Sequence, residues 1–158
     1  MKFWTRFLPG VIDNRYRGHP AALWLFGLLT LMNLTIALVA IFSADGGAGT
    51  ADGIPFGRFG AEGAATVIGV VALLGLAKLL WALLAGLALI RYRALIPLLY
   101  LLIVVDHLAH KGLGLLKPIT HVGHSTGSVV TLALIALSIV GLVLAVVGKG
   151  YRAEPAAS

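Results

Sequence analysis

The sequence predicts an all-α membrane protein, a polytopic bundle of four transmembrane helices, and three observations lead to that prediction. Hydrophobic residues make up 59% of the 158-residue chain and charged residues only 11%, whereas a soluble domain carries roughly twice that share of charge. Four stretches are long enough to cross a bilayer, which takes about 20 apolar residues. None of them alternates with the period of two that is typical of a barrel strand. The composition excludes a soluble enzyme, a disordered chain and a fibrous protein.

The four expected spans and their flanks form one domain over residues 1–158. The spans cover about residues 21–43, 64–90, 94–110 and 127–148, and a segment of residues 1–20 precedes them. The first span is too long for the apolar core of a signal peptide, and no small-x-small cleavage site follows it. We therefore expect it to remain in the protein as a transmembrane helix.

The connections predict which helices are neighbours. Only Arg91, Tyr92 and Arg93 separate the second span from the third, and Pro97 falls in the first turn of the third span, where its missing N–H is tolerated. We expect these two helices to form a tight antiparallel hairpin. The outer loop of residues 44–63 is rich in glycine and alanine, but no strand precedes its glycines, as a nucleotide-binding motif would require. We expect a flexible connector there, with a lid as the alternative.

The basic residues predict the orientation of the chain. If the N-terminus lies inside, the opposite side holds Arg58, Lys111 and Lys117, and Lys78 lies within a span. This positive-inside bias predicts a bacterial inner-membrane protein with both termini in the cytoplasm. It accounts for the net charge of +6 without a nucleic-acid partner. The cytoplasmic side then holds eight of the twelve basic residues: Lys2, Arg6, Arg15, Arg17, Arg91, Arg93, Lys149 and Arg152.

Three polar side chains fall in the middle of the spans. Asn33, Lys78 and Asp106 each lie about 18 Å from the expected inner end of their helix, so we expect one polar layer near the midplane. Ionisable groups at that depth are costly and mark candidate functional sites. The expected hairpin predicts a buried ion pair between Lys78 and Asp106. Two interpretations stay open: a structural clasp that sets helix register, and a pair that binds a proton or a ligand.

Small and polar residues repeat on one face of three spans, which is typical of the packed side of a membrane helix. We therefore expect the four helices to enclose a partly polar centre. The positions are Thr30, Asn33, Ala37 and Ala40 in the first span, Gly75, Ala82 and Ala85 around Lys78 in the second, and His124, Thr131, Ser138 and Ala145 in the fourth.

Four histidines gather toward the outer side and are candidate ligands for a transition metal or haem. His107 and His110 share one helix face at a spacing of three, and His121 and His124 repeat that spacing. Asp106 and His110 are neighbours at a spacing of four. Imidazole nitrogens bind zinc, copper and haem iron, whereas histidines at a membrane border also serve as interfacial hydrogen-bonding groups. We expect no cofactor, with haem or a metal ion as the alternative.

Three short motifs stand out along residues 21–149: G-A-E-G-A-A at Gly60–Ala65, R-Y-R at Arg91–Arg93, and D-H-L-A-H-K-G at Asp106–Gly112. With these motifs, the layout of the chain resembles the DoxX-like group of small bacterial four-helix membrane proteins. The resemblance implies a four-helix membrane fold, and some members are discussed with redox or quinone-linked membrane complexes. The absence of cysteine argues against thiol chemistry of that kind.

These observations favour a non-enzymatic protein, with no catalytic residues, that lies in a lipid bilayer. We expect an accessory protein or small subunit that associates with itself or with a larger membrane complex. One alternative is a small proton-linked transporter that uses Lys78 and Asp106. A second alternative is a haem- or metal-binding redox protein that uses the outer histidines.

Overall fold

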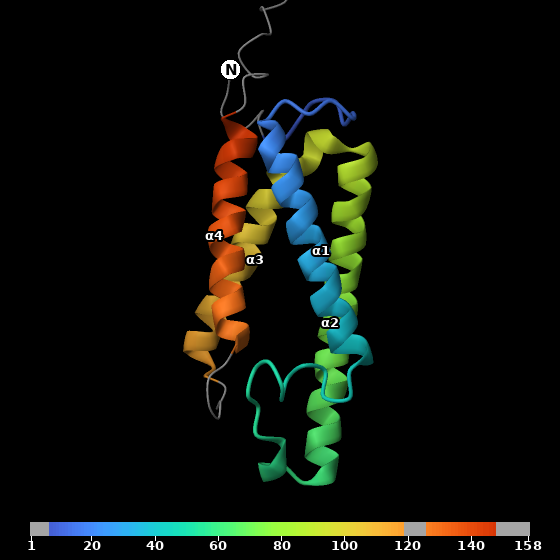
Figure 1. Ribbon diagram of the computed structural model, residues 1–158, viewed down its shortest axis with the longest axis vertical. Helices are drawn as coiled ribbons and strands as arrows, with labels where there is room; N and C mark the ends of the chain where they lie inside the picture. Colours follow the sequence, from blue (N-terminus) through green and yellow to red (C-terminus); the bar gives the residue numbers. More distant parts are fainter. Residues whose placement is uncertain (1–6, 119–125, 148–158) are drawn as a thin grey trace, which may run out of the picture.

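A computed structural model describes residues 7–118 and 126–147, and this part of the chain is helical with no strands. The four long helices are α1 (Pro20–Phe42), α2 (Ala61–Arg91), α3 (Ile96–Leu116) and α4 (Thr126–Val146) (Figure 1). Each of them is long and apolar enough to cross a membrane, which confirms the predicted fold class at that level. The predictions made for Lys2, Arg6, His121, His124, Lys149 and Arg152 lie outside the described residues.

The bundle has two distinct ends. At one end, which we call the arginine end, α1 and α3 begin and α2 stops at Arg91; Arg15, Arg17 and Arg93 flank these helix ends. His19 caps α1, because its Nδ1 accepts a hydrogen bond of 3.2 Å from the N–H of Ala21. The other end, which we call the loop end, holds the connection of residues 43–60 between α1 and α2. The two ends thus separate the described basic residues as the sequence predicted.

The third helix begins close to the predicted position but ends later than predicted. A short 3-10 helix, η3 (Arg93–Leu95), precedes α3, and α3 continues past His110 to Leu116. The hydropathy falls after Asp106, but lysine and leucine are good helix formers, so the helix persists where the apolar run weakens. Pro97 lies in the first turn, as predicted.

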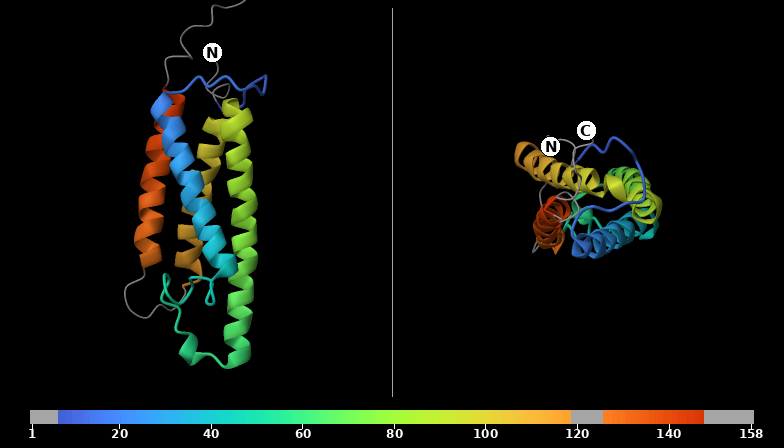
Figure 2. Two further views of the ribbon diagram at one scale, coloured as in Figure 1. Left: turned by 45° about the vertical axis from the view of Figure 1, so that its right-hand side comes forward. Right: turned by 90° about the horizontal axis from the view of Figure 1, so that it is seen from above.

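The helices pack in the order α2, α1, α4, α3. Viewed along the bundle, α1 lies between α2 and α4, and α3 slants away from α2 toward α4 (Figure 2). The contact of α1 with α2 is the most extensive, whereas α2 and α3 share few contacts and diverge after their turn (Figure 1). The predicted tight hairpin is therefore wrong beyond that turn. The small residues of α2 pack on α1, and the inward face of α3 packs on α4.

The small-residue faces are confirmed where the structure describes them. Gly75 packs so closely on α1 that a Cβ built there would lie 2.7 Å from the Cβ of Ala40. On α4, Ser138 and Ala145 are fully buried. Such residues let helix backbones approach closely, so van der Waals contact holds the helices together. The buried residues of α2 are all small: Gly75, Ala82, Ala85 and Ala88.

Tyr100 joins three helices at the centre of the core. Its ring is fully buried and packs edge-to-face on Phe26, with centroids 5.1 Å apart. Its hydroxyl donates a 2.7 Å hydrogen bond to the carbonyl of Ala22 on α1. Gly141 of α4 leaves the space that the ring occupies. A buried phenol needs such a partner, and the bond ties α3 to α1, with which it otherwise shares few contacts.

The connection at the loop end has its own hydrogen bonds, whereas the sequence predicted a flexible connector. The carboxylate of Asp45 accepts bonds from the N–H groups of Gly47 (2.9 Å) and Thr50 (2.8 Å). Gly47 has a φ of 78°, which only glycine adopts at low cost. The loop also reaches α4, where Gly127 donates a 3.0 Å bond to the carbonyl of Ala51.

Acid is expected to loosen this loop. The N–H groups of Gly47 and Thr50 hold the pKa of Asp45 below its ordinary value of 3.8. Because the pKa of Asp45 is lower in the folded loop than in the unfolded chain, the ionised carboxylate stabilises the loop when the pH is above the unfolded-state pKa. That stabilisation is lost as the pH falls through the folded-state pKa. Hydrogen–deuterium exchange of residues 43–60 should show protection in the native protein at neutral pH. As the pH falls below the ordinary carboxyl pKa of 3.8, this protection should decline toward that of the Asp45→Asn variant. A difference between the two proteins that persists in strong acid would contradict the assignment.

Candidate functional site

Asn33, Lys78 and Asp106 lie on helix faces that are buried in the core at the arginine end of the bundle. Phe26 on α1, Ala85 on α2 and Leu99 on α3 belong to one core cluster. Asn33, Lys78 and Asp106 lie seven residues from them, each displaced toward the loop end. Seven residues are two turns, about 10 Å along the axis on nearly the same face. We call the surface formed by these three residues and His110 the polar face.

The polar face is not closed within the chain. Asn33 and Lys78 are only partly buried, although the same helix faces are buried two turns closer to the arginine end. On α3 the side chain of Asp106 is 50% exposed and that of His110 is 58% exposed. The cause is the slant of α3, which leaves α2 after the turn and follows α4.

Asn33, Asp106 and His110 each have a partner within their own helix. The amide nitrogen of Asn33 donates a 2.9 Å bond to the carbonyl of Leu29, one turn earlier. An Asp106 carboxylate oxygen lies 3.4 Å from Nδ1 of His110, as their spacing predicted. Within the described residues, Lys78 makes no side-chain hydrogen bond or ion pair. The structure therefore does not bring Lys78 and Asp106 together in one chain, because the helices that carry them diverge.

His107 and His110 each place a ring nitrogen against a backbone carbonyl one turn earlier in α3. Nδ1 of His107 lies 2.7 Å from the carbonyl of Ile103, and Nδ1 of His110 lies 2.9 Å from that of Asp106. A carbonyl only accepts, so each Nδ1 carries the proton and each neutral ring presents Nε2 as a lone pair. His107 is buried, whereas His110 is exposed. In residues 7–118 and 126–147, no group of three or more acidic or histidine side chains is arranged to hold a metal ion.

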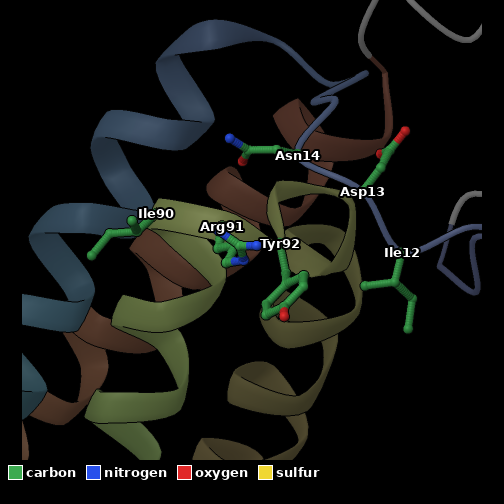
Figure 3. Close-up of a pocket in the computed structure, with 6 residues that line it drawn as sticks. All are labelled: Ile12, Asp13, Asn14, Ile90, Arg91 and Tyr92. Carbon is green, nitrogen blue, oxygen red and sulfur yellow. The ribbon is translucent and has the colours of Figure 1, made fainter.

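A cavity lies at the arginine end, between the segment before α1 and the turn after α2. It has a volume of about 370 Å³ and is lined by Ile12, Asp13, Asn14, Ile90, Arg91 and Tyr92 (Figure 3). Asp13 fixes the segment here, because its carbonyl accepts a 3.3 Å bond from the N–H of Ala94. Its carboxylate points away from Arg91 in Figure 3. The polar side chains of the lining, Asp13, Asn14, Arg91 and Tyr92, offer hydrogen-bond donors and acceptors.

Sequence reasoning missed this cavity and the role of Tyr100. The cavity depends on the path of residues 7–19, which no helical pattern predicts. Tyr100 left a signal, since a lone tyrosine well inside an apolar span requires a hydrogen-bond partner. Its partner, the carbonyl of Ala22, lies 78 residues away and is therefore invisible in the sequence.

Comparisons with protein families, with curated proteins and with solved structures find no match to this chain.

Proposed function

We propose that this chain is a non-enzymatic subunit of a membrane assembly in a bacterial inner membrane, with both termini in the cytoplasm. The observation that carries the proposal is the half-exposed pair of Asp106 and His110 on α3. A carboxylate that faces hydrocarbon at mid-helix costs about 3 kcal/mol. A partner surface that covers Asp106 removes that cost, so association is favoured over an isolated bundle.

The exposure of α3 supports the same proposal. Every residue from 108 to 118 is exposed, including Leu113, Leu115 and Leu116. This end of α3 therefore has no side covered by the described chain. The division of basic residues between the two ends supports the proposed orientation, with the arginine end in the cytoplasm. The layout resemblance to DoxX-like proteins fits this proposal, because some of those proteins are discussed with larger membrane complexes.

A photoreactive amino acid at Leu113 tests the proposal in cells. Leu113 lies seven residues after Asp106, on nearly the same face of α3, and is exposed. We expect irradiation to join this position to a protein. The matched control is Leu80, which is exposed on α2 two residues from Lys78 and so points to the opposite side. We expect only lipid adducts from Leu80. Lipid adducts alone from Leu113 would contradict the assembly and favour the second candidate, a proton-linked transporter that uses Lys78 and Asp106.

A further inference from the structure

The polar face carries two groups of opposite formal charge, Lys78 and Asp106, that form no ion pair with each other in the described chain. Lys78 makes no ion pair there, and Asp106 contacts only His110, which carries no positive charge when neutral. Both charges lie on helices long and apolar enough to cross a membrane. The described residues supply neither a carboxylate for Lys78 nor a lysine or arginine for Asp106, so each charge needs a partner of opposite sign from outside the described part of the chain.

The two charges lie at similar heights along the bundle. Lys78 lies 13 residues before Arg91, about 20 Å from the arginine end of α2. Asp106 lies ten residues after Ile96, about 15 Å from the same end of α3. The remaining difference of about 5 Å is within the reach of the flexible lysine stem.

Closure within one chain is opposed by the core. The inward face of α3 is held on α4 by Tyr100, which fits against Gly141 and bonds to the carbonyl of Ala22. A movement of α3 toward α2 would break this contact. The pairing of Lys78 with Asp106 is therefore easier between two chains than within one.

We propose that a second copy of this chain covers the polar face, and that Lys78 of each copy pairs with Asp106 of the partner subunit. The inference rests on the proposed function and names the partner. The polar face carries a positive and a negative charge at similar heights along the bundle. It is therefore complementary to the same face of a second copy that is related by a two-fold axis parallel to the bundle. Such an axis brings each lysine to the other copy's aspartate and so forms two identical ion pairs. A different protein would have to supply both complementary charges at the same height.

Cysteine crosslinking between two tagged variants tests this arrangement. The chain has no cysteine, so each introduced thiol is unique. One tagged chain carries Lys78→Cys and a differently tagged chain carries Asp106→Cys. In their mixed dimer, one ion pair is replaced by two thiols and the other remains intact. The Cα atoms of an ion pair lie too far apart for a disulfide, which needs less than about 7 Å, so a membrane-permeable bis-maleimide serves as the crosslinker.

We expect a crosslinked dimer that carries both tags when the two variants are co-expressed, and none when either is expressed alone. The matched control replaces Lys78→Cys with Leu80→Cys, on the far side of α2, and should give no product. Crosslinking of the single-variant samples to the same extent as the mixture would overturn the proposed pairing. Absence of the mixed product would also overturn it.

Charge reversal provides a second measurement on the same pair. Lys78→Asp or Asp106→Lys places like charges opposite each other, and we expect each to reduce the dimer measured by light scattering in mild detergent. The double variant restores both pairs and should restore the dimer; a double variant that stays monomeric would overturn the inference. If crosslinking fails while the Leu113 probe captures a different protein, the proposed membrane assembly is supported and the proposed pairing with a second copy is overturned. If the Leu113 probe captures no protein either, both the proposed assembly and the proposed pairing are overturned.

Discussion

Replacing Gly75 with alanine is expected to destabilise the bundle by about 1–3 kcal/mol, the usual cost of overpacking. A Cβ at Gly75 would lie 2.7 Å from the Cβ of Ala40 and 3.2 Å from the backbone carbonyl oxygen of Ala37. A backbone atom cannot rotate away, so α1 and α2 must separate. This contact is the most extensive between any two helices, so Gly75→Leu should disrupt the fold further. The midpoint of thermal unfolding in detergent, followed by size-exclusion chromatography, measures the effect.

Two glycines on the same helix provide the control for this prediction. Gly69 and Gly86 have nothing within 4 Å of a built Cβ. Alanine there should stabilise the helix by up to about 1 kcal/mol, because glycine is the weaker helix former. The sign of the effect should therefore differ between Gly75 and the two controls. Equal shifts at all three positions would contradict the close packing of α1 on α2.

Replacing Gly141 with alanine is expected to cost a similar amount, about 1–3 kcal/mol, through overpacking. The added Cβ would collide with the ring of Tyr100. That ring has little freedom to move, because it packs on Phe26 and its hydroxyl bonds to the carbonyl of Ala22. Relief of the collision would break the link between α3 and α1. The thermal midpoint should fall despite the better helix propensity of alanine.

A double-mutant cycle with Tyr100→Leu isolates this contact. Leucine lacks the outer part of the ring, so Gly141→Ala should cost much less in that background. Residues in direct contact typically show a coupling of about 0.5–3 kcal/mol. Additive effects of the two substitutions would show that Gly141 and Tyr100 do not meet. The cycle also tests the anchor that keeps α3 away from Lys78.

Most of the secondary structure could be predicted from the sequence, because it depends on local properties. Continuous apolar runs long enough for a span predicted four helices, and the structure has four. The closely packed faces were also predictable, since Gly75 and Ala82 on α2 and Ser138 on α4 are small residues at helical spacing. The C-terminal end of α3 could not be predicted, because hydropathy measures polarity and does not indicate where a helix ends.

The partners of the candidate site residues could not be predicted in this way. The positions of Asn33, Lys78 and Asp106 along their helices follow from counting residues. The proposed pairing within one chain assumed that a three-residue connection keeps two helices together along their full length. A short connection constrains only the helix ends. The direction of α3 beyond Tyr92 is set by its packing, through Tyr100, on Gly141 of α4.

Four apolar helices, their small-residue faces and the height of each polar side chain follow from the amino-acid sequence alone. These features depend on residue type and on the regular rise of a helix, which neighbouring helices do not alter. Which helices are neighbours follows from the packing of the folded chain. That choice depends on the fit between surfaces far apart in the chain, such as Tyr100 against Gly141 and Gly75 against Ala40. Through that fit α3 turns toward α4, and Lys78 and Asp106 form no ion pair with each other in the described chain.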